Sequence, residues 1–386
     1  MLSILHIASD EKFINAANYL FEKAFPGSNH FIIPKSRFQK DFIYVKPGHN
    51  VERVYFGKNL KRKLAREAEK FDCVFIHSIS EFNSNVFLLS TAKNKFVGIL
   101  WGAELYTEEN FRRSNLFGKL TSEIILPEPV YSRIENIKRI IRKFIYGKEE
   151  SLMDATKNAA LNLKYLCFPF DEEFMLFRDL KLISEDCRQV PFSYYPLQYI
   201  IRGADSVTTD GNDILVGNSA SASNNHLEAF EILKDLDTGD RRIIVPLSYG
   251  DSFYADFIEK TGISAFGSKF IPLRRFLALD DYTRLIKACG IVIMNHYRQQ
   301  ALGTVLAMLY MGGKVFFSES NTIYKYLSRV GVKVFSIESE LNHNNQAALT
   351  NLSPADMEKN RSILRELMSE DKIIERMKAG LKDFIA

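Results

Sequence analysis

The sequence lacks any long apolar run, and no stretch approaches the roughly 18 uninterrupted apolar residues that a membrane-spanning helix needs. Its opening residues, MLSILHIASD, carry no basic leader, so we interpret them as a buried strand and not as a secretory signal. Cysteine is scarce: the four residues are far apart and form no C-x-x-C pair, which predicts reduced thiols in a cytoplasmic protein and no zinc site. A formal net charge of only +4 gives no support for a nucleic-acid partner.

What is present is the composition of an ordinary globular protein, 46% apolar and 25% charged, in a chain long enough for two domains. Short apolar runs alternate with helical patterns, which is typical of parallel α/β sheets. In the first half we expect strands at 2–8, 30–34, 73–77 and 95–100, with helices near 13–21, 58–70 and 84–93. In the second half we expect strands at 213–216, 242–246, 290–295 and 314–317, with helices at 225–234, 252–261, 280–289, 303–311 and 321–329.

Two such series predict two Rossmann-like domains, over 1–200 and 201–386. The break is expected within 190–212, where two prolines precede a polar stretch that contains glycine. The charged segment 354–386 is predicted to be helical, and its last helices either stay with the second domain or pack back on the first.

The stretch ILVGNSASASNNHLEAF joins an apolar strand to a helix through small polar residues. Gly217 permits close approach of a ligand to the backbone, and Asn218 and Ser219 keep the site open. Asn224 or Asn225 is expected to cap the helix, whose N-terminus favours an anion such as a diphosphate. An ordinary strand-to-helix loop with a helix cap explains the same pattern.

A second strand end lies in IVIMNHYRQQALGTVLAM, where polar residues again precede a helix of small residues. Arg298 suits bidentate contact with phosphate, beside Gln299 and Gln300. Gly303 and Thr304 open the helix and offer backbone donors, although Gly303 also fits close helix–sheet packing. Two such ends in one domain predict a nucleotide-diphosphate pocket.

Five segments resemble motifs of a bacterial glycosyltransferase family: ILVGNSASASNNH, IIVPLSYGD, RQQALGT, WGAELY and VFIHSISEFN. This is family 56, which transfers 4-acetamido-4,6-dideoxygalactose from its TDP derivative to a lipid-linked intermediate of enterobacterial common antigen. The resemblance spans 74–330, whereas the extreme N-terminus and 107–200 match poorly. It implies a GT-B fold, in which two Rossmann-like domains face each other across a cleft. It further implies that the second domain, with Tyr249, holds the nucleotide sugar and the first holds the acceptor.

Candidate catalytic side chains follow two strands of the first half. Glu104, beside Trp101 and Gly102, is a candidate acceptor-binding or basic carboxylate, or else a solvent-facing carboxylate at a helix start. His77 ends the preceding strand and is expected to meet Glu104, or else is a structural histidine. Asp10 is a weaker candidate.

Metal binding is not expected, and no cofactor is predicted. Asp235 and Asp237 form a D-x-D, the metal signature of another glycosyltransferase class, but they follow an amphipathic helix and not a buried strand. Neutralisation of the diphosphate is therefore assigned to Arg298 and to helix N-termini.

The segment 131–148, YSRIENIKRIIRKFIYGK, combines an isoleucine-rich face with cations that include Arg139, Arg142 and Lys143. A basic amphipathic helix of this kind binds anionic bilayers, but a solvated face on an ordinary domain helix gives the same pattern.

Together these features predict a metal-independent hexosyltransferase on the cytoplasmic face of the bacterial inner membrane. It would be a peripheral protein on an anionic membrane surface, and the resemblance implies a TDP-sugar donor and an undecaprenyl-diphosphate-linked acceptor as its partners. Three alternatives remain: a transferase of another nucleotide sugar for capsule or O-antigen, a non-catalytic nucleotide-sugar-binding protein, and a two-domain sugar epimerase.

Overall fold

The computed structural model describes residues 2–38, 41–125, 154–201, 208–277, 279–345 and 347–385. The chain divides into two compact units. The first, here the N-terminal unit, comprises 1–110, 126–196 and 370–386, and the second, the C-terminal unit, comprises 111–125 and 197–369. Within the part of the chain that is described, no helix is both long and apolar enough to cross a membrane.

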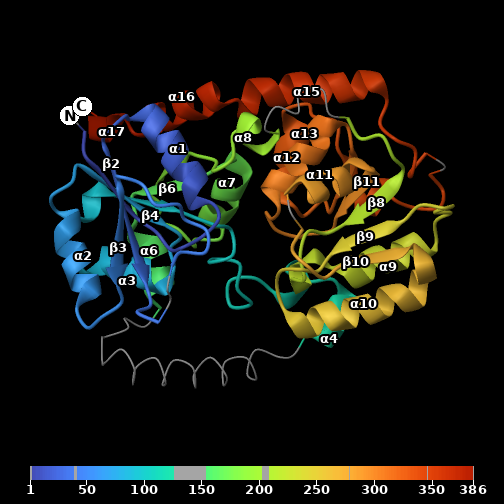
Figure 1. The fold of residues 1–386 in the computed structure, drawn as a ribbon, viewed down its shortest axis with the longest axis horizontal. Coiled ribbons are helices and arrows are strands. Elements are labelled where there is room, and N and C mark those ends of the chain that lie inside the picture. Colours follow the sequence, from blue (N-terminus) through green and yellow to red (C-terminus); the bar gives the residue numbers. More distant parts are fainter. Residues whose placement is uncertain are drawn as a thin grey trace. The chain divides into compact units, whose positions relative to one another are not determined.

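The N-terminal unit is built on a parallel sheet of seven strands in the order β3-β2-β1-β4-β5-β6-β7, with helices on both faces (Figure 1). The strands are β1 (Ile4–Ile7), β2 (Asn29–Lys35), β3 (Val51–Tyr55), β4 (Cys73–His77), β5 (Phe96–Ile99), β6 (Tyr165–Phe168) and β7 (Arg188–Pro191). The helices include α1 (Ile14–Ala24), α2 (Leu60–Ala68), α3 (Glu81–Leu89), α6 (Ala155–Asn162), α7 (Asp171–Asp179), α16 (Glu370–Gly380) and α17 (Lys382–Ile385). The last two come from the far end of the chain, and α16 packs on α1 and β7.

The C-terminal unit repeats the design with a parallel sheet of six strands in the order β10-β9-β8-β11-β12-β13 (Figure 1). Its strands are β8 (Asp213–Val216), β9 (Ile243–Pro246), β10 (Phe270–Leu273), β11 (Cys289–Met294), β12 (Lys314–Phe317) and β13 (Phe335–Ser336). Its helices include α4 (Lys119–Ile124), α8 (Leu197–Ile201), α9 (His226–Lys234), α10 (Ser252–Phe266), α11 (Leu279–Lys287), α12 (Leu302–Met311), α13 (Thr322–Arg329), α14 (Ile337–Glu340) and α15 (Pro354–Met368).

All the expected strands and helices of the described residues are present, with shifted ends. For example, α3 begins at Glu81 and not at 84, because the Ser80 side chain accepts the Asn83 N–H and caps the helix there. The sequence analysis missed β3, β6, β7, β10 and the short β13. It also assigned 111–125 to the first domain, whereas this segment belongs to the C-terminal unit. The segment 370–386 belongs to the N-terminal unit, which is one of the two alternatives given for the last helices.

The strand order fixes where a ligand can bind in each unit. In both sheets the order reverses beside the first strand of the unit, between β1 and β4 and between β8 and β11. Ligands of open parallel sheets bind outside the carboxyl ends of the strands at such a reversal. The central strands are buried, as β4 and β11 are along their whole length, because helices cover both sheet faces. Ligands are therefore expected at the ends of β1 and β4 in the N-terminal unit and at the ends of β8 and β11 in the C-terminal unit.

Candidate active site

In the C-terminal unit, the loop after β8 is shaped around Gly217. Its φ of +67° is left-handed, and a Cβ there would lie 2.6 Å from Asn224 Oδ1 and 2.8 Å from His226 Nε2. Asn224 Oδ1 accepts the Asn218 N–H at 2.8 Å and, from the other side, the ring of His296 at 2.8 Å. Only glycine fits this turn, so the backbone of 217–218 stays close to the strand end.

Asn225 occupies the N-cap position of α9, as one of the two expected alternatives, but its side chain makes no capping hydrogen bond to the helix. Asn224 is committed to the turn, and the Asn225 side chain accepts the Gly118 N–H at 2.9 Å and donates to the Asn295 carbonyl at 2.9 Å. Glu228, in the first turn of α9, accepts from the backbone and hydroxyl of Thr121 at 2.9 and 2.6 Å. The segment around α4 therefore lies against the start of α9, which weakens the case for an anion at that helix end.

The loops that follow β8 and β11 are in contact, which a single pocket formed by both strand ends requires. Gln300 donates from Nε2 to Asn218 Oδ1 at 2.9 Å and accepts the Ser223 hydroxyl at 2.7 Å. The Arg298 guanidinium reaches the same Ser223 oxygen at 3.4 Å. Asn321, which caps α13 after β12, donates to the carbonyls of His296 and Arg298 at 3.0 Å each. Residues that follow β8 and β12 thus hold the loop after β11, and that loop carries Arg298.

Other predicted donor-site residues border this loop. The residue before α12, Ala301, has a φ of +59°, and Gly303 and Thr304 lie in the first turn of that half-buried helix start. After β9, the backbone at Gly250 pairs with Ala220, and the neighbouring Tyr249 side chain is 62% exposed. Gln299 offers its carbonyl to the Arg298 guanidinium at 3.2 Å.

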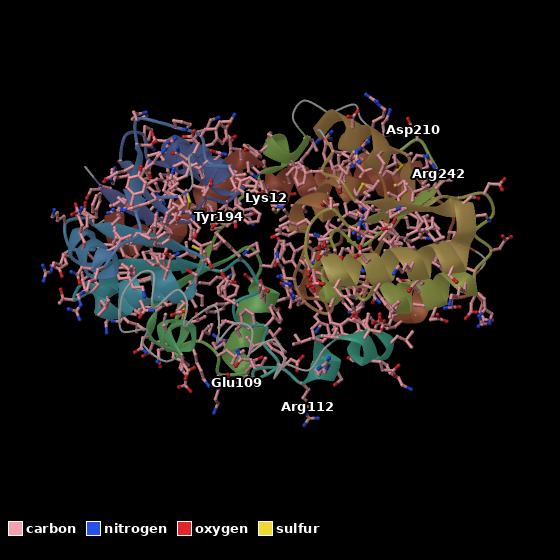
Figure 2. The ribbon with its side chains drawn as sticks, turned by 60° about the horizontal axis from the view of Figure 1, so that its bottom comes forward. Lys12, Glu109, Arg112, Tyr194, Asp210 and Arg242 are labelled. Carbon is pink, nitrogen blue, oxygen red and sulfur yellow. The ribbon has the colours of Figure 1, made fainter. Side chains whose placement is uncertain are left out.

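In the N-terminal unit, a chain of hydrogen bonds crosses the ends of β1 and β4. Tyr194, labelled in Figure 2, places its hydroxyl 2.9 Å from Trp101 Nε1 and 3.0 Å from His77 Nδ1. His77 Nε2 lies 3.0 Å from His6 Nδ1, and His6 Nε2 lies 3.2 Å from Asn29 Oδ1. Both histidine rings are fully buried.

The direction of this chain follows from its last member. The Asn29 amide nitrogen donates to Glu22 Oε1 and to the Phe25 carbonyl, so Asn29 Oδ1 is an acceptor and His6 Nε2 must carry a proton. A neutral His6 then accepts at Nδ1 from His77, and a neutral His77 accepts at Nδ1 from Tyr194. With these protonation states, each group of the chain donates a hydrogen bond to the next one, from Trp101 Nε1 at one end to Asn29 Oδ1 at the other.

Burial enforces the neutral state of these rings. Desolvation lowers the pKa of His77 to about 3, and burial together with the neighbouring His77 lowers the pKa of His6 well below its usual value. In the C-terminal unit burial likewise lowers the pKa of His226 to about 3. His77 was predicted to meet Glu104, but both of its ring nitrogens bond elsewhere, so the geometry favours the structural alternative for this residue.

Glu104 is held at the end of β5. Its carboxylate accepts the Ser78 hydroxyl at 2.7 Å and the Trp101 N–H at 3.0 and 3.1 Å. Ser78 directly follows His77 and has a strained φ of +73°, which turns its hydroxyl toward the carboxylate. The ring of Phe13, before α1, lies 5.5 Å from the Trp101 ring. A half-buried carboxylate among partly exposed aromatic rings suits a hydroxyl-bearing acceptor.

The remaining candidates are placed as follows. Asp10 accepts three backbone N–H groups from 43–45, so its role is to anchor that loop. Asp235 ends α9 and Asp237 accepts the Gly239 N–H, which confirms that the D-x-D lies at a helix end. Among the described residues, no group of three or more potential ligands gathers to hold a metal. Arg139, Arg142 and Lys143 lie outside the described residues.

Sequence reasoning missed His6, Tyr194, Ser78 and Asn321. His6 and Tyr194 lie 71 and 117 positions from His77, and no local pattern links them. Ser78 and Asn321 each follow a predicted strand, and that position was the available signal.

Comparison with known proteins confirms the family resemblance. Residues 179–361, which include both glycine-containing strand ends, match the family described as 4-alpha-L-fucosyltransferase, glycosyl transferase group 56.

Solved structures confirm the GT-B fold class. HepE of Anabaena, in complex with UDP and glucose, has a TM-score of 0.62 at 12% identity over 99% of this chain and 100% of that one. Sucrose-phosphate synthase from Thermosynechococcus elongatus has a TM-score of 0.63 at 10% identity over 100% and 99%. The N-terminal domain of trehalose-6-phosphate phosphatase from Candida albicans has a TM-score of 0.63 at 13% identity over 100% and 97%.

Proposed function

We propose that this chain, a glycosyltransferase of group 56, transfers a 4-acetamido-4,6-dideoxyhexose from a TDP-sugar to an undecaprenyl-diphosphate-linked saccharide. The single observation that carries the donor half is the meeting of β8 and β11 through Gln300, which sets Arg298 beside Asn218 and Ser223. The reaction would serve the synthesis of bacterial surface polysaccharides.

The donor would bind at the C-terminal unit. Arg298 would contact the diphosphate, aided by backbone N–H groups at the start of α12 around Gly303 and Thr304. Gln299 and Gln300 would fix the loop and contact the sugar, and the exposed Tyr249 ring offers a stacking face for the base. The solved HepE complexes contain UDP or UDP-glucose, which supports a nucleotide sugar as the donor.

The acceptor would bind at the N-terminal unit. An oxygen of the acceptor hydroxyl would form a bond to the anomeric carbon while the bond from that carbon to the diphosphate breaks and TDP leaves with the electron pair. The hydroxyl proton would pass to Glu104, which is already oriented by Ser78 and the Trp101 N–H. Tyr194, itself bonded to His77, would hold the Trp101 ring in place through its hydrogen bond to Trp101 Nε1. Neither His77 nor Tyr194 would touch the reacting atoms.

Charge on the departing TDP would be stabilised by Arg298 and by the start of α12, without a metal ion. The helix-end position of Asp235 and Asp237 supports this part of the proposal.

The protein would act as a peripheral protein on the cytoplasmic face of the inner membrane. The support is the sequence of 131–148, whose cations would each contribute about 1 kcal/mol near an anionic surface. Changing Arg139, Arg142 and Lys143 together to Glu should release the protein from anionic liposomes, and the released fraction should grow with salt. Equal sedimentation of the variant and the wild type would remove the segment from the membrane contact.

A nucleotide panel tests the donor. Thermal unfolding is followed with TDP, UDP, GDP and ADP, because a ligand of the folded state raises the midpoint. TDP should give the largest rise. A larger rise with another nucleotide would favour the transferase of a different sugar, and binding without turnover on any acceptor would favour a non-catalytic binding protein. Conversion of the sugar without an acceptor would identify an epimerase.

A further inference from the structure

The N-terminal unit exposes large apolar side chains at one end of its sheet. Phe38 is 87% exposed and Ile43 is 74% exposed, both in the loop after β2, and Tyr55, the last residue of β3, is 54% exposed. Because β2 and β3 are adjacent parallel strands, their carboxyl ends share one edge of the sheet. Clustered exposed apolar groups of this kind indicate an interaction site.

The loop holds Ile43 outward by its own hydrogen bonds. Asp10 accepts the N–H groups of Ile43, Tyr44 and Val45 at 2.6, 3.0 and 2.9 Å. Asn15 donates to the Tyr44 carbonyl at 2.7 Å and accepts the Lys46 N–H at 2.9 Å. The base of the loop is thus fixed on the start of α1, and exposure of Ile43 is a property of the folded state.

Exposed cations are close in sequence to these apolar side chains, and Asp41, the carboxylate between Phe38 and Ile43, pairs with Arg53 at 3.0 Å. Arg37, Lys46 and Lys58 are exposed, and 58–70 contains six cations against two carboxylates. Both carboxylates already have partners, since Glu67 pairs with Lys70 at 2.8 Å and Glu69 accepts the Thr91 hydroxyl at 2.7 Å. A groove of about 500 Å³ on α2 is lined by Asn59, Arg62, Lys63, Arg66, Glu67 and Lys70.

We propose that Arg37, Phe38, Ile43, Lys46, Tyr55 and Lys58, here called the edge surface, dock on an anionic lipid bilayer. The apolar side chains enter the headgroup region, and the cations, continued along α2, contact lipid phosphates. A bilayer suits this surface because exposed apolar side chains lie beside exposed cations, the combination with which proteins bind anionic membrane surfaces.

The edge surface also lies near the proposed acceptor site. Glu104 follows β5, at the same edge of the same sheet and three strands from β2, which is roughly 14 Å at the usual strand spacing. Asp10 and Phe13, in one short connection, join the Ile43 loop to the Trp101 ring. Docking here would bring a lipid-linked acceptor to Glu104. The delivery of an acceptor to Glu104 rests on the proposed function, whereas the docking of the edge surface on a bilayer does not.

Vesicle sedimentation of the full-length chain tests the edge surface. On vesicles that contain phosphatidylglycerol, Arg37→Ala with Lys46→Ala should weaken binding roughly 30-fold, at about 1 kcal/mol for each cation. Phe38→Ser with Ile43→Ser should weaken binding roughly tenfold or more through lost apolar burial. Thermal unfolding and TDP affinity should stay those of the wild type, because all four side chains are exposed.

Control variants remove exposed cations and exposed apolar side chains at the opposite, amino edge of this sheet. Lys93→Ala with Lys164→Ala removes two exposed cations that precede β5 and β6, and Leu161→Ser with Leu180→Ser removes two exposed leucines. Both control variants should bind as the wild type does.

Two outcomes would overturn the edge surface. The first is that the variants of the edge surface bind vesicles as the wild type does. This includes the result in which only the variant of 131–148 is released from the vesicles. The other is a wild-type protein that sediments with neither anionic nor pure phosphatidylcholine vesicles. In both cases transfer to a soluble short-chain acceptor would remain intact if the proposed function holds. A failure of bilayer docking can therefore be told from a failure of the proposed function.

Discussion

Gln300 donates a hydrogen bond to Asn218 Oδ1 across 2.9 Å, although the two residues lie 82 positions apart in the chain. This bond joins the ends of β8 and β11 at the point where the strand order of the C-terminal sheet reverses. A pocket at this point of a parallel sheet suits a nucleotide. The loop that Gln300 holds also carries Arg298, so one side-chain amide links the fold to the proposed diphosphate contact.

Arg298→Ala should weaken TDP binding by roughly 1.5–3 kcal/mol, the scale of hydrogen bonds to a charged group. Arg242→Ala is the matched control, since Arg242 lies in the same unit at the amino edge (Figure 2), where it pairs with Asp213. Calorimetry with TDP checks both variants. Equal affinity of Arg298→Ala and the wild type would exclude Arg298 from the donor site.

Gly217→Ala should destabilise the C-terminal unit by about 2–4 kcal/mol, through left-handed strain together with the contact to Asn224 Oδ1. Gly239→Ala is the control, because its φ is also positive, at +52°, but no described atom lies within 4 Å of the added Cβ. It should cost only about 1 kcal/mol. Urea unfolding measures both, and equal costs would show that Gly217 is needed for its φ alone.

Glu104→Gln should reduce kcat by about 10²–10⁴-fold, the usual contribution of a general base, while TDP affinity stays unchanged. The amide keeps one acceptor oxygen for Ser78 or the Trp101 N–H, so folding should be largely preserved. Glu109→Gln is the control, since that exposed carboxylate lies 3.0 Å from Lys157 Nζ in a surface ion pair. A Glu104→Gln enzyme with full kcat would leave the carboxylate a purely structural role.

The buried histidines should make the protein lose stability in mild acid. The pKa of His77 is about 3 when folded and about 6.5 when unfolded, so only the unfolded chain takes up a proton between these values. The contribution of neutral His77 to the free energy of unfolding is therefore fully present above about pH 6.5 and is lost as the pH falls toward 3. From pH 6.5 to 4.5 His77 alone should account for about 2–3 kcal/mol.

Urea unfolding as a function of pH measures this slope. His77→Asn should make the slope shallower, whereas His343→Gln, at an exposed position, should leave it unchanged. A wild-type stability that is constant between pH 6.5 and 4.5 would contradict the assignment of neutral buried rings.

Transfer should persist in excess EDTA, and the double variant Asp235→Asn with Asp237→Asn should remain active, because both side chains lie at the end of α9. The assay compares rates before and after chelation and after Mg²⁺ is added back. Loss of turnover that Mg²⁺ restores would refute the metal-independent proposal.

The sequence predicted the elements that periodicity and burial encode. The apolar runs at β1, β4, β8 and β11 were clear, and their polar ends predicted that Asn218 and Arg298 would share a pocket. Edge strands were harder: β3, VERVY, is mostly exposed and has too few apolar residues to read as a buried strand. The chain from Trp101 through Tyr194 to His6 depends on partners far apart in sequence, and the use of Asn225 to hold Gly118 depends on packing of a distant segment. Neither has a local signal.

The most direct test of the account is transfer itself. The purified chain is incubated with TDP-4-acetamido-4,6-dideoxygalactose and an undecaprenyl-diphosphate-linked saccharide, and the lipid product is analysed by mass spectrometry. We expect a product heavier by one acetamido-dideoxyhexose residue, formed with equimolar release of TDP and abolished or strongly reduced in Glu104→Gln. An unchanged acceptor in the presence of a donor that binds the folded chain would contradict it.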